Sequence, residues 1–416
     1  MFKSFILAAG AALLIGTPAL AGPAGDTLKA ALYAGAFDDG LAKLQPLAAG
    51  GDTEAAFGVG AIKLTQALEH FSHTLYQHGF DLPNAQAAGI RSDITVPQNP
   101  NPQPFDYDGV RTMLATFVTE LDDARISFDA AGKSGDYVIE LNPLLVRVDA
   151  NGDGHADENE TLAGLYALWT HRPITDIIGP AAPDGPPKFD YVGLDRADAF
   201  WFAGYTEVIA AQADFLLAHD FSSFVNSSFH RFFPKAGFPM QPYGEGGSLV
   251  FGGDTDTALA DLVAAIHTIS WPVTDPAKLS GVRDRLKAVL AYSRQNWDAI
   301  LAETDDNHEL VPSPKQTSMI PDSSVTDEKV TAWRATLDEA DKLLDGQLLV
   351  PHWRFKQGFD LKAYFTEAKR TDLVMLLTGF DAVPYLKDGP IASATDFGAV
   401  QAAFGNEWLG YAFWFN

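Results

Sequence analysis

Apolar residues recur three and four positions apart along most of this chain, which is the spacing of an amphipathic α-helix. The first such run covers residues 25–78, and a second extends to Ile126 from Asp108, which is placed to cap its first turn. Later runs that also begin with an Asp or Thr predict helices over 195–219, 254–270, 275–303 and 326–344.

Runs typical of β-strands are few and short. The clearest are the continuous apolar stretches 372–380 (DLVMLLTGF) and 408–416 (WLGYAFWFN). The pattern as a whole therefore predicts a mainly α fold, a helical domain with minor short β segments.

Proline and glycine interrupt the helical runs in two places. Residues 81–104 are rich in Pro and Asn and carry no periodicity, which predicts a linker or long loop, and 179–190 is a second break. We expect an N-terminal helical hairpin region over 22–80 and a main helical domain over 105–416.

The first 21 residues have the features of a secretory signal peptide. Lys3 precedes an apolar stretch from Phe5 to Ile15, and small residues end at Ala21. We expect cleavage after Ala21 and a periplasmic or secreted protein; an uncleaved anchor is the alternative. No later segment is apolar enough to span a bilayer, so the mature chain is expected to be soluble and without a membrane anchor.

Composition narrows the possible partners. The formal net charge is −25, which disfavours nucleic acid and anionic membrane surfaces. The chain has no cysteine, which excludes disulfides, a thiol nucleophile and a thiolate metal site. Hydrophobic residues make up 47% of the chain and include 28 Phe, so a large core can supply the stability.

The most specific chemical signal is the run DANGDGHADENE at residues 149–160. It places oxygen donors at alternate positions and at the end, with Gly154 where the chain must turn sharply. The candidate metal ligands are Asp149, Asn151, Asp153, His155 through its backbone carbonyl, Asp157, and Glu160 through both carboxylate oxygens.

This pattern resembles the calcium-binding loop of EF-hand proteins, and the resemblance implies a Ca²⁺ site. The plainer alternative is a solvated acidic turn, because Asp, Asn and Gly are also common turn residues. Turn chemistry does not require this spacing of carboxylates, which repel one another unless a cation lies among them. A flexible cage of many oxygens also favours Ca²⁺ over Mg²⁺.

The residues around the loop indicate an unpaired site. Ala156 occupies the position where paired EF-hands carry an aliphatic residue, and no second complete loop occurs in the sequence. The preceding segment 136–148 is rich in β-branched residues, so a regular incoming helix is not expected, whereas 158–169 has helical spacing. With only 5 Met in the chain, a structural clamp is favoured over a sensor that opens.

A second resemblance covers residues 34–60, whose small and apolar positions are similar to a tetratricopeptide or Sel1-type helical hairpin. Such repeats need about three units to bury a continuous core, and no clear second copy follows. We therefore expect this hairpin to pack on the rest of the protein.

Other clusters are weaker candidates for chemistry. Glu69, His70 and His73 lie on one helical run, and the two histidines could hold zinc with a third ligand or simply pack there. His230, or a pair of His219 with Asp220, could act as a base, but no nucleophile motif accompanies them.

Two acidic or glycine-rich loops complete the candidates. The glycine-rich run 243–254 leads into an acidic helix start, which would repel phosphate, so we expect an ordinary loop with Asp254 as the helix cap. The run 304–309 could hold a weak second cation through Asp305, Asn307 and Glu309, although a solvated loop is favoured.

Together these features predict an exported, soluble calcium-binding protein with a structural or stabilising Ca²⁺ site and no visible catalytic apparatus. Two alternatives stay open. One is a periplasmic hydrolase that uses His70 or His230 with calcium as support, and the other is a periplasmic protein-interaction module that docks a protein partner through the N-terminal hairpin.

Overall fold

The computed structural model describes residues 22–81, 96–164, 191–244, 247–317, 324–393 and 398–404, together with positions 412, 414 and 415. The signal peptide expected over 1–21, most of the linker expected over 81–104 and the Pro/Gly break at 179–190 lie outside the described residues.

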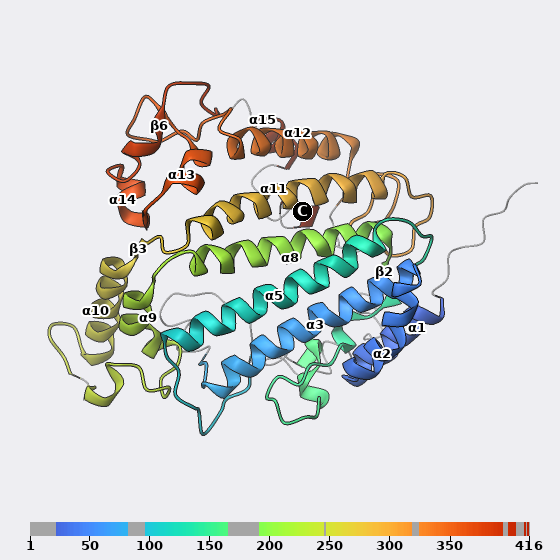
Figure 1. Ribbon diagram of the computed structural model, residues 1–416, viewed down its shortest axis with the longest axis horizontal. Coiled ribbons are helices and arrows are strands. Elements are labelled where there is room, and N and C mark those ends of the chain that lie inside the picture. Colours follow the sequence, from blue (N-terminus) through green and yellow to red (C-terminus); the bar gives the residue numbers. More distant parts are fainter. Residues whose placement is uncertain are drawn as a thin grey trace, which may run out of the picture.

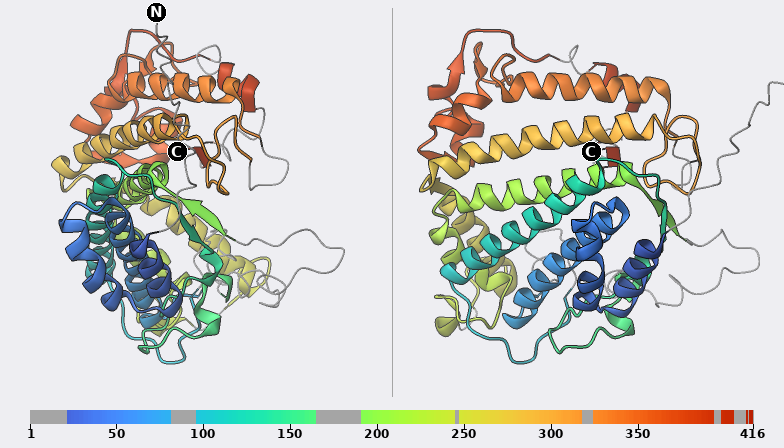
Figure 2. Two further views of the ribbon diagram at one scale, coloured as in Figure 1. Left: turned by 90° about the vertical axis from the view of Figure 1, so that its right-hand side faces the viewer. Right: turned by 45° about the vertical axis from the view of Figure 1, so that its right-hand side comes forward.

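Long helices packed side by side form the centre of the molecule (Figure 1). Each packs against the next, and both views in Figure 2 show the same succession. In order they are α3 (Thr53–Gln77), α5 (Tyr107–Ala131), α8 (Arg196–Leu217), α11 (Pro276–Ile300) and α12 (Asp327–Leu344).

The N-terminal helices α1 (Pro23–Ala34) and α2 (Phe37–Ala49) pack against each other and against α3. Leu28 of α1 and Phe57 of α3 are fully buried in one core cluster that also contains Phe128 of α5. The hairpin therefore packs on the rest of the protein, as expected from its sequence.

The strands form three small antiparallel pairs within the described residues. β1 (Ile139–Leu141) pairs with β2 (Val192–Leu194), β3 (Ser270–Pro272) with β5 (Arg370–Asp372), and β4 (Gly358–Phe359) with β6 (Leu386–Lys387). Each pair is too short to be stable alone, so each depends on the helices around it.

Shorter helices surround the row. They are α9 (Ser222–Ser228), α10 (Gly253–Thr268), α13 (Leu361–Glu367), α14 (Leu373–Thr378) and α15 (Gly398–Phe404). Helices α9 and α10 lie beside the left-hand ends of α5 and α8 in Figure 1, and α13, α14 and α15 lie near α11 and α12. Single 3₁₀ turns span Pro143–Leu145, Glu158–Glu160, Phe229–Arg231, Gln241–Tyr243 and Val383–Tyr385.

The expected helix starts are mostly confirmed by their caps. The side chains of Asp195, Asp275 and Thr326 accept hydrogen bonds from backbone N–H groups of the first turn. At α5 the prediction was wrong by two residues, because Asp106 caps the helix instead of Asp108. At α10 it was also wrong, because the helix begins after Gly252, which offers no side-chain cap, and Asp254 lies inside its first turn.

The strand expected over 372–380 is wrong, because most of that run is helix α14. Asp372 caps the first turn of α14, and Gly379 ends the helix with a φ of 109°. These helix-start and helix-end residues outweigh the continuous apolar run, which by itself indicates a strand. The run 408–416 lies largely outside the described residues, and its three described positions are helical.

The prediction of a mainly α fold with minor β segments is confirmed. Among the described helices, none combines the length and the apolar character needed to cross a membrane.

Candidate functional site

The ends of the loop at 149–160 are joined by a short antiparallel bridge between Arg147 and Thr161. The N–H of Val148 donates to the carbonyl of Glu160 at 3.0 Å, and that of Leu162 donates to Val146 at 2.9 Å. No helix enters the loop, in agreement with the expectation for segment 136–148.

The first residue of the loop, Asp149, organises the turn that follows it. One carboxylate oxygen accepts the N–H groups of Gly152 and Asp153 at 2.7 and 3.2 Å, and the other accepts that of Gly154 at 2.8 Å. Gly152 and Gly154 have φ values of 73° and 87°, in the left-handed region that side chains disfavour. The glycine expected at position 154 is therefore required by the backbone, and so is a second one at 152.

In the middle of the loop, side-chain oxygens again accept backbone N–H groups, here from the residue two positions later. The side-chain oxygen of Asn151 accepts the N–H of Asp153 at 2.8 Å, and Asp153 accepts that of His155 at 2.9 Å. These contacts turn successive side-chain oxygens back toward the loop's own backbone. His155 itself is exposed.

Glu160 closes the loop from its other end. Its Oε1 accepts the N–H groups of Ala150 and Asn151 at 3.1 and 3.2 Å, and its Oε2 accepts that of Asp157 at 3.1 Å. Asp157 in turn caps the 3₁₀ turn that ends at Glu160. Burial raises the pKa of Glu160, and the nearby carboxylates of Asp157 and Asp149 add to the shift.

The exit from the loop is described only at its beginning. Residues 162–164 are helical, and Leu165, Tyr166 and Trp169, which carried the expected helical spacing, lie outside the described residues.

Helix α3 holds the start of the loop, which the sequence alone did not reveal. The carboxylate of Glu69 accepts the backbone N–H of Asp149 at 2.7 Å, and the Nε2 of His73 contacts the carbonyl of the same residue. His73 Nε2 also lies 3.8 Å from the Asp149 carboxylate. Burial raises the pKa of Glu69, which the N–H of Asp149 partly offsets.

These contacts separate the three residues considered above as a zinc site. Glu69 and His73 face the loop, whereas His70 pairs with Glu120 of α5 at 2.7 Å. Two of the three side chains therefore contact the loop and the third contacts α5, so they do not converge on one point.

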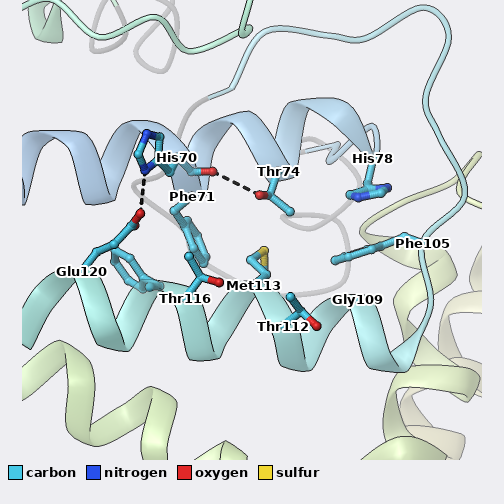
Figure 3. Close-up of a pocket in the computed structure, with 11 residues that line it drawn as sticks. His70, Phe71, Thr74, His78, Phe105, Gly109, Thr112, Met113, Thr116 and Glu120 are labelled. Carbon is cyan, nitrogen blue, oxygen red and sulfur yellow. Dashed lines mark hydrogen bonds and ion pairs between the residues drawn. The ribbon is translucent and has the colours of Figure 1, made fainter. Parts of the chain in front are cut away.

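A groove of about 300 Å³ lies between α3 and α5, beside the His70–Glu120 pair (Figure 3). Phe71, Met113 and Phe117 are among its apolar lining residues, and His78 stacks on Phe105 at 4.1 Å between ring centres at its far end. Its lining threonines include Thr74 and Thr112, whose hydroxyls donate to backbone carbonyls at 3.1 and 2.9 Å.

Neither of these two hydroxyls is therefore directed at the ring of His70. The closest hydroxyl in sequence, that of Thr74, donates to the carbonyl of His70 and not to its ring. The groove offers an apolar surface and one imidazole–carboxylate pair.

The other histidines considered as bases have structural contacts. His219 is fully buried and bonds Phe215 O and the hydroxyl of Thr371, and burial lowers its pKa. Its sequence neighbour Asp220 instead accepts the N–H of Ser222. His230 contacts the carboxylate of Asp261 at 3.2 Å, where it helps to anchor α10.

A half-buried carboxylate cluster, consisting of Asp195, Glu303 and Glu309, was missed by the sequence analysis. Oxygen atoms of the three residues lie within 4.8 Å of one another, and no other part of the described chain gathers three potential metal ligands as closely. The carboxylates of the 149–160 loop are thus spread more widely than these.

Crowding and burial keep protons on this cluster. Burial, with the charge of Asp195 as a further cause, raises the pKa of Glu303 to about 10, and burial raises that of Glu309 to about 7. The carboxylate of Asp198 accepts the backbone N–H of Asp195. Burial and the charge of Asp195 raise the pKa of Asp198 well above its usual value. Such a group of carboxyls can share protons or hold a cation.

The three residues considered in the run 304–309 have different surroundings in the structure. Asp305 accepts a hydrogen bond from the side chain of Asn307, and both stay beside the cluster. Glu309 instead turns inward to Asp195 and Glu303, which come from the start of α8 and the end of α11. The separation of these residues along the sequence hid the cluster.

The chain matches no family model, no characterised protein and no solved structure with which it was compared. Its function must therefore be argued from the geometry of its own residues.

Proposed function

We propose that this protein is an exported, non-enzymatic calcium-binding protein in which residues 149–160 hold one Ca²⁺ as a structural clamp. The observation that carries the proposal is the closure of the loop from both ends. Asp149, its first candidate ligand, is held by α3, and Glu160, its last, binds backbone N–H groups at both the start and the end of the loop.

The donor set suits a hard cation. Carboxylate, amide and carbonyl oxygens are the ligands that Ca²⁺ prefers, and the loop offers no sulfur and no aligned pair of imidazoles. The proposed ligands are the six residues expected from the sequence: Asp149, Asn151, Asp153, His155, Asp157 and Glu160. An ion at about 2.4 Å from each oxygen would draw the spread carboxylates inward and relieve their repulsion.

The surroundings of the loop favour a clamp over a sensor. The N–H of Arg147 donates to Leu32 at the end of α1 at 2.9 Å, and its guanidinium donates to the carbonyl of Ala156 at 3.2 Å. On the other side, Glu69 of α3 holds Asp149. A bound ion would therefore join α1 and α3 through one loop, and its binding free energy would add to the stability of the folded state.

Calorimetric titration of metal-free protein tests the proposal. We expect one Ca²⁺ with a dissociation constant of about 10⁻⁴ to 10⁻³ M, the range of unpaired extracellular sites. At about 100 times that constant, the free energy of unfolding should rise by about 2.7 kcal/mol, with a higher melting temperature.

The variants Asp149→Ala and Glu160→Ala each remove one end of the ligand set, so both should lose the binding heat and the calcium-dependent rise in melting temperature. Glu140→Ala, which removes an exposed carboxylate of β1 outside the loop, is the matched control and should bind as the natural chain does. A natural chain whose melting ignores both calcium and chelator would leave the loop as an acidic turn and overturn the proposal.

The half-buried carboxylate cluster provides the second control. If calcium instead bound Asp195, Glu303 and Glu309, the substitution Glu309→Gln would remove the binding heat and Glu160→Ala would not. We expect the opposite pattern, because Glu303 and Glu309 of the cluster have raised pKa values and retain protons near neutral pH.

A further inference from the structure

Helix α10 exposes its apolar residues and buries a polar one. Leu259, Leu262, Val263 and Ile266 recur three and four positions apart, and between 48 and 56% of each is exposed. Asp261 is the residue of this helix that is buried among those described. In most surface helices the apolar stripe faces the core instead.

The inner side of α10 is held by charge. The carboxylate of Asp261 receives a hydrogen bond from Arg231 and lies 3.2 Å from the Nε2 of His230. Both partners belong to the 3₁₀ turn Phe229–Arg231, which follows α9. The orientation of the helix is thus fixed by a buried ion pair, which leaves the apolar stripe facing away from the core.

The loop before α10 exposes three further apolar residues next to the start of the helix. Leu249, Val250 and Phe251 are 90, 69 and 71% exposed. Their backbone N–H groups donate to the carboxylate of Asp256 at 2.6, 2.9 and 3.0 Å, which lowers the pKa of Asp256. The three side chains are therefore presented by an ordered turn at the start of the helix.

We propose that this apolar face, formed by residues 249–251 and the stripe of α10, is the contact surface for a second copy of the same chain. An antiparallel arrangement with its two-fold axis between positions 262 and 263 makes the stripe self-complementary. Leu259 then lies opposite the partner's Ile266, and Leu262 lies opposite the partner's Val263.

The size of the face suits such a contact. Seven large apolar side chains, each about half exposed or more, offer several hundred Å² to a partner. Standard specific protein–protein interfaces bury roughly 800 Å² on each side, with an apolar centre and a polar rim. Exposed apolar patches of this kind on a protein surface mark interaction sites.

Charge argues against a lipid surface as the occupant. Helices that lie on membranes carry Lys and Arg on their polar face, whereas α10 has none and has Asp254 and Asp256 in its first turn. The two helix dipoles of an antiparallel pair, by contrast, attract each other.

Sedimentation or light scattering of the purified full chain over a range of concentrations tests the proposal. We expect a dimer that Leu262→Asp converts to a monomer, since the substitution places a charge at the centre of the contact. Ile126→Asp, which changes an exposed apolar residue of α5, should leave the dimer intact. A natural chain that is monomeric throughout, or a dimer that Leu262→Asp leaves unchanged, overturns the proposal.

Cysteine cross-linking gives a readout that does not depend on the folding of the aspartate variant. The natural chain has no cysteine, so a single introduced thiol can pair only with its copy. Leu262→Cys should form a covalent dimer under mild oxidation, and Ile126→Cys should not. Equal cross-linking of the two variants, or flotation of the natural chain with vesicles of anionic lipid, would count against a second copy as the occupant.

Discussion

At the scale of single residues, several carboxylates determine local structure by accepting backbone N–H groups. Asp149 and Glu160 fold a loop around themselves, Asp256 orders an exposed turn, and Asp195 caps a helix while it crowds Glu303. The sequence singled out Asp149 and Glu160 as candidate calcium ligands, because the oxygen donors of their loop lie within twelve residues of one another. It could not reveal the crowding of Asp195, whose neighbours are distant in sequence and meet it only after the helices pack.

The crowded cluster makes stability depend on pH in a definite direction. Burial raises the pKa of Glu309 from 4.5 to about 7, so the folded state retains a proton that the unfolded state loses above pH 4.5. The stabilising contribution is complete below pH 4.5 and is lost as the pH rises to about 7. This shift corresponds to a loss of about 3 kcal/mol in the free energy of unfolding.

We therefore expect Glu309→Gln, which cannot ionise, to show a smaller loss of stability between pH 5 and pH 8. Urea unfolding in the presence of chelator measures the difference. Glu140→Gln, at an exposed site, should follow the natural chain. The same pH dependence in all three proteins would show that Glu309 ionises normally in the folded state.

At the scale of elements, periodicity and capping residues predicted most helices, and the errors have physical causes. Helix α14 was taken for a strand because its run is continuously apolar, although Asp372 and Gly379 mark its ends. The contact of α3 with the loop could not be predicted either. Glu69 and His73 were read as possible metal ligands because helical spacing shows which side chains share a face, but not what that face meets.

Two glycines inside helices allow the effect of helix propensity on stability to be compared with the effect of packing. A Cβ at Gly281 of α11 would meet no atom within 4 Å, whereas one at Gly60 of α3 would lie 2.8 Å from the ring of Phe128 in α5. Gly281→Ala should raise the free energy of unfolding by up to about 1 kcal/mol, because alanine is the better helix former. Gly60→Ala gains the same propensity but should destabilise by about 1 to 3 kcal/mol, because α3 and α5 must move apart.

Chemical denaturation of both variants checks this pair of predictions in the same assay. The sign of the difference is the informative quantity, since the two substitutions are chemically identical. Stabilisation by both would mean that α3 and α5 tolerate a wider separation than their close contact indicates.

At the scale of the whole molecule, the order of the long helices was not predictable from the sequence. Amphipathic periods show that α5, α8 and α11 pack, but not that they pack in succession. One cation joins all three: Arg285 of α11 donates to Asp122 of α5 at 2.8 Å and to Glu207 and Asp214 of α8 at 2.7 Å. These contacts make Arg285 a test of whether the row of helices depends on charge as well as on apolar packing.

Arg285→Met keeps much of the apolar stem but leaves three carboxylates close together in a largely buried place. Removing the partner of a buried charge costs about 3 to 5 kcal/mol when the charge is left uncompensated. Here Arg125 still contacts Asp122 and Glu207, and Lys278 still contacts Asp214, so we expect a loss at the lower end of that range. Arg294→Met, from the same helix, removes a more exposed guanidinium paired with Asp338 and Asp341, and should cost less than about 1 kcal/mol. Urea unfolding at neutral pH compares the two. If the variants were equally stable, water would screen the Arg285 network as well as it screens the surface pairs, and apolar packing alone would hold α5, α8 and α11 together.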